Sequence, residues 1–536
     1  MSGTGMQGHE FDFEKYRLRR FVDQLIERGD VDVHEGPVAL TALGSIIEKT
    51  PRAALFKQAG PERVELAAKV AASRDRLMLA LDATPSTVHE KLLTRIASPR
   101  TSIEIPSNEA PVHAVQITGK DIDLTKLPFY PQHEFDGSCY ISSGIDYVID
   151  PISGRTNVGS RRLALRNRYQ AGTNVTSPSD LKRIYEGCAK RRERLPISFT
   201  LGAHPLDFLA ATTRLQGDEH HMISHLRGES APFVKSLTND ILVPADAEIV
   251  IEGYLDERGY CEPEGPYGEY MGYYGAIHMD PVFTCTAITM RRDVMHQTLQ
   301  HGSAFVLDQT DAACMTQLRI EANAMRILKN IVQEPIAVSS RSLSGGSGHL
   351  RISLKQHRHG EARNAILGIF AAMPQIKHVY VFDEDIDPAD DGQCDWAFGT
   401  RFQADTDIVM VTGMMGRPMD PSLNGKRTGA KAGFDCTMAF GRAQSIVQTR
   451  CAAMEFGRAA RFQTVEQALE AGPLFYSHLV EAVGSSDGRE VAVALDELRA
   501  QGRLGRDRDG RYHLTQGTPG ETAIVGELYH DPNKGI

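Results

Sequence analysis

Four runs rich in β-branched and aromatic residues constrain most strongly what this chain can fold into. They are VHAVQITG (112–119), YISSGIDYVID (140–150), AEIVIEGYL (247–255) and PVFTCTAITM (281–290). Proline, glycine and aspartate residues stand between them, as they do between the strands of a sheet. We therefore predict that residues 111–310 form a β-rich domain, either barrel-like or mixed α/β.

Helical patterns flank this region on both sides. Apolar residues at 18, 21, 22, 25 and 26 followed by Gly29 predict a helix within an N-terminal α/β domain, residues 1–110. A second helical pattern covers Leu318–Val332 and ends before Pro335. Residues 350–356, 360–373 and 377–387 then follow the order strand, helix, strand, which predicts a βαβ unit in a further α/β domain, residues 311–460. The expected fold class is a mixed α/β multidomain protein.

Residues 461–536 form a separate pattern. SHLVEAVG, GREVAVALDELRAQGRL and GRDRDGRYHLT indicate two helices and a hairpin with Asp509-Gly510 as its turn. This order is typical of a winged-helix-like module. It is also compatible with a tail that packs on a neighbouring subunit, and we favour this role in oligomerisation because of the charge of the chain.

The charge balance excludes several classes of function. The chain of 536 residues has 59 Lys and Arg against 69 Asp and Glu, a net charge of −10, so we expect no binding to nucleic acid. It contains no run of about 18 apolar residues and no apolar stretch after a basic start, so we expect neither a membrane span nor a signal peptide. The eight cysteines are scattered without a CxxC pair, which predicts reduced thiols and a cytoplasmic enzyme.

Two carboxylates lie in the densest cluster of unusual residues, Cys261–Tyr274. Glu264 and Glu269 bracket a Gly-Pro-Tyr-Gly turn, so both side chains are expected to face one space. Two carboxylates in one pocket do not ionise together easily, and the protonated partner becomes a general acid near neutral pH. The same pattern is also typical of a solvated loop.

Two further clusters carry polar residues of other kinds. Residues 157–162 place Asn157 and Arg162 around a glycine, which supplies an amide, close backbone approach and a guanidinium fork for a carboxylate. Residues 216–221 mix carboxylate and imidazole side chains and are sufficient for one or two bonds to a divalent metal. Taken separately, these clusters also fit a hairpin end and a polar helix start.

The order of these clusters resembles the UbiD-type reversible decarboxylases that use prenylated FMN. The matching segments are Asn157…Arg162, Glu219 before Leu226-Arg-Gly, ILVPADAEIVIEG (241–253), PEGPYGE (263–269) before GYY, KHVYVFDEDID (377–387), DWAFGTRF (395–402) and GAKAGFDCT (429–437). The resemblance extends over about residues 10–460. It implies a carboxy-lyase with a UbiD-like fold, in which a central split β-barrel-type domain binds the flavin and a C-terminal α/β domain follows.

The resemblance also implies individual roles for three residues. Arg162, Glu264 and Glu269 match the family's catalytic Arg-Glu-Glu network. Arg162 would reach the substrate carboxylate while Glu264 holds it, and Glu269 would donate the proton that replaces carbon dioxide.

For the flavin, the resemblance implies backbone contacts from Gly159, Ser160 and Arg161. Thr212 or Thr213 would lie on the other side of the cofactor. Lys431, in the GAKAGFDCT segment, would meet the phosphate, although a surface lysine is an equally good interpretation.

For the metal, the resemblance implies a manganese-like divalent ion and potassium beside the phosphate, with Asn157 and Glu219 as ligands. The family's histidine ligand is missing, because no histidine occurs between Asn157 and His204. Gln170 or the neighbourhood of Thr176 stands opposite it, and His220 or His221 is a possible substitute. We therefore expect potassium or a weakened divalent site.

The leading hypothesis is a reversible decarboxylase of an aromatic or heteroaromatic acid. Tyr270, Met271 and Tyr273 beside Glu269 suggest an aromatic-lined pocket. Expected partners are a flavin prenyltransferase that supplies the cofactor and further copies of the chain in a homodimer or larger assembly. The alternatives are an aryl-CoA thioester decarboxylase, an ordinary FMN-binding oxidoreductase, and a regulatory scaffold whose winged-helix-like tail reports ligand binding.

Overall fold

The computed structural model describes residues 11–175, 178–441, 449–516 and 523–524. The chain folds into two compact units, residues 1–438 and 439–536. Each unit is described by itself.

Six strands close into a barrel at the centre of the first unit. Their order is β12-β9-β6-β7-β8-β17, and β17 pairs again with β12. The bounds are β6 (Tyr140–Ile149), β7 (Thr156–Leu165), β8 (Gln170–Thr173), β9 (Leu195–Leu201), β12 (Ile249–Leu255) and β17 (Val282–Met290), while β5 (Val115–Thr118) extends the sheet from β17. The strands predicted around 112–119, 140–150, 247–255 and 281–290 are therefore confirmed.

Alternate residues of the barrel strands enter different cores. On β6 and β7, Val148 and Leu163 pack with Phe199, whereas Tyr147 and Val158 pack with helices on the other side. Successive side chains of a strand point to opposite faces of the sheet. The two neighbouring arginines on β7 therefore have different surroundings, which decides which of them enters the site.

The N-terminal sheet includes one strand from a distant part of the chain. Its order is β1-β2-β3-β18, in which β18 (His296–Thr298) runs parallel to β3. The helix predicted from residue 18 is confirmed as α1, and Gly29 follows it with φ +69°. The other elements are α1 (Leu18–Glu27), β1 (Val31–Val38), α2 (Leu40–Lys49), β2 (Ala53–Ala59), β3 (Val64–Ala68), α3 (Arg74–Leu81) and α4 (Val88–Ala97).

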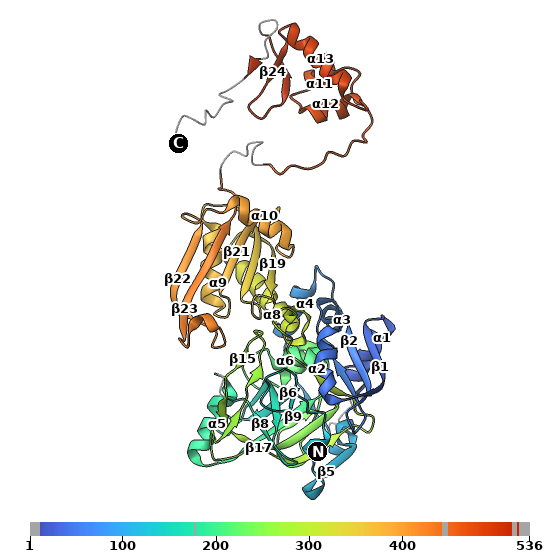
Figure 1. The fold of residues 1–536 in the computed structure, drawn as a ribbon, viewed down its shortest axis with the longest axis vertical. Coiled ribbons are helices and arrows are strands. Elements are labelled where there is room, and N and C mark those ends of the chain that lie inside the picture. The colour runs from blue at the N-terminus through green and yellow to red at the C-terminus, as the bar shows by residue number, and fades with distance from the viewer. Residues whose placement is uncertain (1–10, 176–177, 442–448, 517–522, 525–536) are drawn as a thin grey trace, which may run out of the picture. The chain divides into compact units, whose positions relative to one another are not determined.

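A second sheet lies after the barrel, with the order β19-β20-β21-β23-β22. The predicted βαβ unit is confirmed, because β20 and β21 are parallel and α9 connects them. Helix α8 packs against both α4 and β19 (Figure 1). The bounds are α8 (Asp311–Leu328), β19 (Glu334–Arg341), β20 (His349–Lys355), α9 (Glu361–Ala372), β21 (His378–Asp383), α10 (Asp391–Arg401), β22 (Ile408–Met415) and β23 (Thr428–Cys436).

Shorter elements complete the first unit around the barrel. Strands β4, β10 and β11 form a sheet of three, and helices α6 and α7 pack on each other. The bounds are β4 (Ile103–Glu104), α5 (Asp180–Arg191), α6 (Pro205–Ala211), α7 (His221–Arg227), β10 (Pro232–Lys235) and β11 (Leu242–Pro244).

The second unit has its own apolar core, which includes Leu479, Val491 and Leu504. Strands β24 and β25 form a hairpin, and Gly510 in its turn has φ +91°. The unit begins at residue 439, before the predicted boundary at 461, and residues 450–462 carry no helix or strand. Its elements are α11 (Val465–Glu470), α12 (Tyr476–Val483), α13 (Arg489–Ala500), β24 (Leu504–Arg506), β25 (Tyr512–Leu514) and β26 (Ala523–Ile524).

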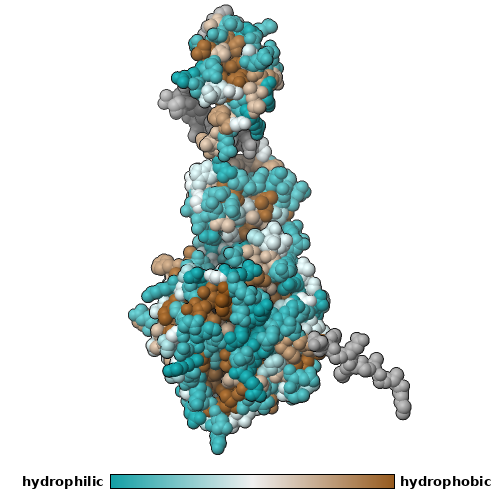
Figure 2. Space-filling model, turned by 90° about the vertical axis from the view of Figure 1, so that its right-hand side faces the viewer, coloured by the Kyte–Doolittle hydropathy of each residue, from teal (hydrophilic) through white to brown (hydrophobic). Residues whose placement is uncertain are grey.

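Hydrophilic residues cover most of the face shown in Figure 2, and apolar residues form separate patches on it. Within the described residues, no helix is long and apolar enough to span a membrane. All eight cysteines have free thiols in the structure.

Several histidines in the first unit have pKa values that burial lowers. Burial is the main cause that lowers the pKa of His204 and His301 to about 3, and that of His220, His296 and His349 to about 4. In the unfolded chain these groups titrate near 6.5. Above pH 6.5 these histidines are neutral in both states and do not affect the stability of the fold. As the pH falls from 6.5 toward the lowered values, the unfolded chain binds protons that the folded chain does not, and the free energy of unfolding decreases.

We expect His204→Asn to reduce this acid sensitivity. His204 is 5% exposed, and its Nδ1 accepts the Leu206 amide at the start of α6, a bond that an asparagine oxygen can also accept. For a fully buried histidine the loss is about 1.4 kcal/mol per pH unit below 6.5. Denaturant unfolding at pH 7 and pH 5.5 measures the loss of unfolding free energy. If this loss is equal in wild type and variant, the prediction is contradicted.

Candidate active site

A two-tier hairpin spanning residues 262–280 carries the two predicted glutamates. Strand β13 (Glu262–Glu264) pairs with β16 (His278–Asp280), and β14 (Tyr267–Gly268) pairs with β15 (Tyr274–Gly275). At the tip, the Glu269 amide donates to the Tyr273 carbonyl at 2.9 Å. Glu264 therefore lies in the β13–β16 pair, and Glu269 lies in the turn between β14 and β15.

Arg162 joins the two glutamates into one cluster. Its Nε and one terminal nitrogen donate to the two oxygens of Glu264 at 2.9 and 2.8 Å. Its other terminal nitrogen donates to Glu269 Oε1 at 2.9 Å. The structure thus brings together all three residues of the expected network, although Arg162 is more than 100 positions from either glutamate in the sequence.

The two carboxylates differ in accessibility. The side chain of Glu264 is 1% exposed and both of its oxygens are bound by Arg162, whereas that of Glu269 is 14% exposed and uses one oxygen. Burial by itself would lower the pKa of Arg162, but the bonds and charges of the glutamates outweigh burial and raise it. The cluster therefore contains the permanently charged guanidinium of Arg162, the Glu264 carboxylate with both oxygens bound, and the Glu269 carboxylate, which is open to a ligand.

Two tyrosine rings flank the guanidinium. Arg162 lies over the Tyr267 ring at 4.3 Å and near the Tyr140 ring at 5.9 Å, both suited to cation–π attraction. The Tyr267 hydroxyl donates to Gln132 Oε1 at 2.8 Å. No pattern in the sequence singled out Tyr140, and Tyr267 entered the expected site only as part of the Gly-Pro-Tyr-Gly turn.

A further buried acid lies beside Glu264 and was not predicted. Asp280 is opposite Glu262 in the β13–β16 pair and is fully buried. Burial is the largest cause that raises the pKa of Asp280 to about 6, and the charge of Glu264 adds to it. Its Oδ1 accepts the Val175 amide at 2.9 Å. Asp280 therefore ties the loop after β8 to the glutamate hairpin.

Asn157 and Glu219, the predicted metal ligands, are also adjacent. Asn157 Nδ2 and the Val158 amide donate to Glu219 Oε2 at 2.7 and 2.9 Å. Burial is the largest cause that raises the pKa of Glu219. In the described part of the chain, no group of three His, Cys, Asp or Glu side chains is arranged to hold a metal. Asn157 and Glu219 supply only two side-chain ligands, so a cation held here would need its other ligands from the cofactor phosphate or from water.

The other residues considered as a third ligand lie elsewhere. The Gln170 side chain contacts Asn167 and Thr284, at 3.1 and 3.4 Å, and does not reach Asn157 or Glu219. The His220 and His221 rings contact each other at a tilt of 57° with centres 4.1 Å apart, and the His221 ring accepts the Ser102 amide. Thr176 is outside the described residues.

The predicted flavin contacts on β7 alternate between the two faces of the strand. Arg161 turns to the face of Gly159, where its Nε lies 3.3 Å from the buried Asp146 and a terminal nitrogen donates to the Asn174 carbonyl. Ser160 is exposed on the opposite face, which it shares with Arg162. This face of β7, with a small exposed residue beside the Arg162 cluster, is open to a ligand and is the face on which the expected flavin would lie.

The remaining predicted contacts have partners within the protein. The Thr212 and Thr213 hydroxyls donate to carbonyls of the preceding α6 turn, and Arg319 donates to the Thr212 carbonyl. Lys431 is 3% exposed on β23, and its Nζ donates to the Pro374 carbonyl at 2.8 Å. Burial lowers the pKa of Lys431 to about 8. No contact in the described structure joins Lys431 to the Asn157–Glu219 pair.

Most of the first unit matches two domains of one known family. Residues 104–304 match the 3-octaprenyl-4-hydroxybenzoate carboxy-lyase Rift-related domain of UbiD, and residues 313–436 match the C-terminal domain of the same carboxy-lyase. Together the matches cover more than half of the chain. The chain belongs to the UbiD family. The predicted family, fold class and carboxy-lyase class are thereby confirmed.

Several UbiD relatives align with most of their length. Anhydromevalonate phosphate decarboxylase of Methanosarcina mazei is 29% identical over 424 residues, which are 78% of this chain and 95% of the relative. The UbiD-class enzyme HmfF from Pelotomaculum thermopropionicum, solved in complex with FMN, is 29% identical with a TM-score of 0.76 and covers 82% of this chain and 97% of its own. An evolved dimeric form of HmfF, in complex with prenylated FMN, is 28% identical with a TM-score of 0.72, covering 80% of this chain and 96% of its own.

Proposed function

We propose that this UbiD-family chain is a reversible, non-oxidative decarboxylase that uses prenylated FMN. The observation that carries the proposal is a single arginine bound to two glutamates, of which only Glu269 is open to a ligand. The complexes of HmfF with FMN and with prenylated FMN support the cofactor.

Arg162 holds the substrate carboxylate in this proposal. A guanidinium has five N–H donors, and three are used by Glu264 and Glu269, so two remain for the substrate. The two hydrogen bonds that Arg162 donates to Glu264 fix the plane of the guanidinium and keep it charged. The substrate is therefore oriented by a group that cannot rotate away.

Glu269 supplies the proton. As the bond from the substrate carbon to the carboxylate breaks, carbon dioxide leaves, and bound prenylated FMN supplies the electron sink for the pair left behind. The Glu269 carboxyl then transfers its proton to that carbon, a C–H bond forms, and solvent restores the proton. In the reverse direction the Glu269 carboxylate removes the same proton.

Residues around β7 hold the flavin. The backbone of Gly159, Ser160 and Arg161 would contact its ring system, and Thr212 or Thr213 would contact it from the other side. Asn157 and Glu219 would hold potassium or a weakly bound divalent ion beside its phosphate, and Lys431 would reach the phosphate only by giving up its bond to the Pro374 carbonyl.

The proposed substrate is an aromatic or heteroaromatic acid, free or as an aryl-CoA thioester. Tyr140 and Tyr267 beside Arg162 are fully buried and hold the arginine, whereas Tyr273, which is 55% exposed beside Glu269, is the aromatic ring that supports a flat substrate. A second candidate is a non-aromatic unsaturated acid that carries a phosphate, because anhydromevalonate phosphate decarboxylase is a relative across most of its length.

Deuterium incorporation distinguishes these substrates. Cofactor-loaded enzyme in deuterated water is incubated with aromatic acids, heteroaromatic acids, an aryl-CoA acid and anhydromevalonate phosphate, and products are analysed by mass spectrometry. We expect deuterium at the position that carboxylate leaves in the aromatic or heteroaromatic set. Turnover of anhydromevalonate phosphate alone would favour the second candidate. Turnover with unmodified FMN as the released flavin would contradict the cofactor.

The proposal includes two partners and a location. A flavin prenyltransferase in the cytoplasm supplies the cofactor, so expression without it is expected to give enzyme that carries unmodified FMN and is inactive. The chain forms a homodimer or larger assembly with the C-terminal region as its interface, for which light scattering of the full chain before and after removal of residues 439–536 is the test.

A further inference from the structure

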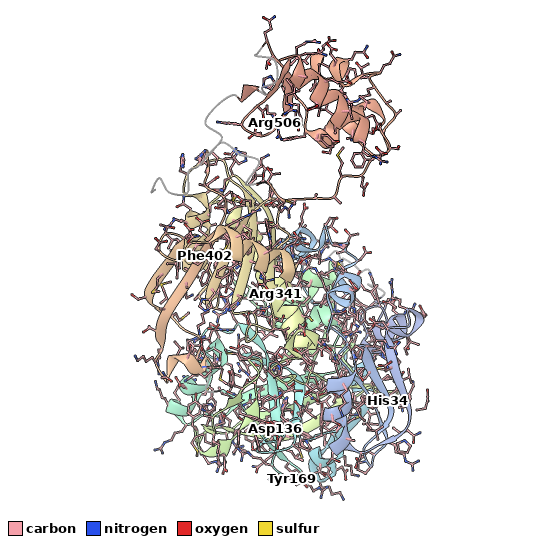
Figure 3. All side chains as sticks on the ribbon, turned by 45° about the horizontal axis from the view of Figure 1, so that its top comes forward. His34, Asp136, Tyr169, Arg341, Phe402 and Arg506 are labelled. Atoms are coloured by element: carbon pink, nitrogen blue, oxygen red, sulfur yellow. The ribbon has the colours of Figure 1, made fainter. Side chains whose placement is uncertain are left out.

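A turn that precedes β6, residues 132–137, clasps the hairpin that carries Glu269. At its centre is Asp136, whose side chain is fully buried; it is labelled in Figure 3. Its Oδ2 accepts the Gln132 and His133 amides at 2.9 Å each, which are bonds within the turn. Its Oδ1 accepts the Gly268 amide at 3.0 Å, and Gly268 immediately precedes Glu269.

The two backbones approach too closely for side chains to intervene. The Gly137 amide donates to the Pro266 carbonyl at 2.8 Å, and a Cβ on Gly137 would collide with the Gly265 carbonyl oxygen. A Cβ on Gly268 would likewise collide with the His133 ring. The position of the Glu269 peptide therefore depends directly on the turn at 132–137.

His133 anchors the same turn from its other side. Its Nε2 lies 2.5 Å from the His301 carbonyl oxygen, and its Nδ1 lies 3.4 Å from Asp136 Oδ1. Burial by itself would lower the pKa of His133, but the bonds to Asp136 and His301 outweigh burial and raise it. Asp136 and His133 thus connect the turn at 132–137 to the glutamate hairpin and to the segment at residue 301.

We propose that Asp136 is a positioning residue for the proton donor. It fixes the peptide at Gly268 so that the Glu269 carboxyl stays 2.9 Å from Arg162 and beside the reacting carbon. This inference rests on the proposed role of Glu269. Because a displacement of about 1 Å in an active site reduces the rate by about 100-fold, loss of the Asp136 bond should reduce kcat on that scale.

Asp136→Asn is the direct test. One of the two carboxylate oxygens becomes an NH2 group, which cannot accept, so either Gly268 or the turn loses its bond. The matched control is Glu252→Gln on β12. Glu252 is equally buried and accepts the Leu237 and Thr238 amides at 2.8 and 2.7 Å, in a loop that has no contact with the cluster around Arg162.

The measurements are kcat, KM, flavin affinity and hydrogen exchange of both loops in the cofactor-loaded full chain. For Asp136→Asn we expect kcat to fall about 100-fold, KM and flavin affinity to stay within about twofold, and amide exchange to accelerate at 264–274. For Glu252→Gln we expect faster exchange at 237–241 and unchanged kcat. If both variants lose kcat equally, or if Asp136→Asn keeps wild-type kcat, the proposal is overturned.

A second variant keeps the proposal testable if Asp136→Asn does not fold. Gly268→Ala moves the hairpin away from the turn and leaves Asp136 itself unchanged, so it should also lower kcat with KM preserved. Glu269→Gln separates this proposal from the proposed function. If that variant remains active, the proton-donor role fails; if it is inactive while Asp136→Asn and Gly268→Ala are normal, only the positioning role fails.

Discussion

Glu269→Gln is expected to lower turnover by roughly 10²–10⁴-fold, the range over which a positioned general acid accelerates proton transfer. The amide oxygen of glutamine still accepts the bond from Arg162, now 2.9 Å long, so the geometry of the cluster is retained. The amide is far too weak an acid to transfer a proton to the substrate carbon. Steady-state decarboxylation measures the loss, and mass spectrometry of the released flavin shows whether the variant still binds the cofactor.

Glu262→Gln is the matched control for this prediction. Glu262 lies on the same hairpin, is 39% exposed and pairs with Arg166 at 3.5 Å, outside the Arg162 cluster. We expect its turnover to stay within about threefold of wild type, because an exposed pair of this kind contributes little. Wild-type turnover in Glu269→Gln, with the flavin bound, would remove Glu269 from the mechanism.

The barrel could be predicted because its signals are local. Residues 140–150 were expected as one strand, and β6 covers Tyr140–Ile149. The start of α8 was missed: the apolar pattern predicts Leu318, whereas Thr310 caps the helix by accepting the Ala313 amide and the helix begins at Asp311. The end was also placed too late, at Val332 instead of Leu328. Pro335 does not terminate the helix directly but lies in β19, at an irregular point in its pairing with β20.

Long-range pairing was beyond the reach of sequence patterns. The N-terminal sheet takes β18 from residues 296–298, so residues 1–110 do not supply the whole of that sheet. A strand of only three residues cannot be recognised by periodicity, because at least two repeats are needed to show alternation. Only the fold of the intervening chain brings His296 beside Leu66.

Sequence patterns alone do not predict the site, because its contacts also join residues far apart in the chain. Arg162, Glu264 and Glu269 were expected together from the resemblance, since no spacing rule connects residues 102 and 107 positions apart. Asp136 gave no signal, because an aspartate before a glycine is typical of any turn. Its contact with Gly268 exists only because barrel closure brings the start of β6 against the hairpin that precedes β17.

Arg162→Met should have the largest combined effect on activity and stability. Removing the guanidinium leaves Glu264, with a 1% exposed side chain, and Glu269 without their counter-charge, and breaking a buried pair in this way costs about 3–5 kcal/mol. Decarboxylation should fall below detection, because no other group in the cluster can bind the substrate carboxylate. Denaturant unfolding and steady-state turnover measure the two effects.

Two companion variants separate charge from packing in this prediction. Arg166→Met removes the partly exposed pair with Glu262 and should cost no more than about 1 kcal/mol. The double variant Arg162→Met with Glu264→Gln removes the unpaired buried charge, so it should recover part of the lost stability while turnover stays absent. If the double variant is as unstable as Arg162→Met alone, the loss comes from packing of the arginine side chain between Tyr140 and Tyr267 and not from the uncompensated carboxylate.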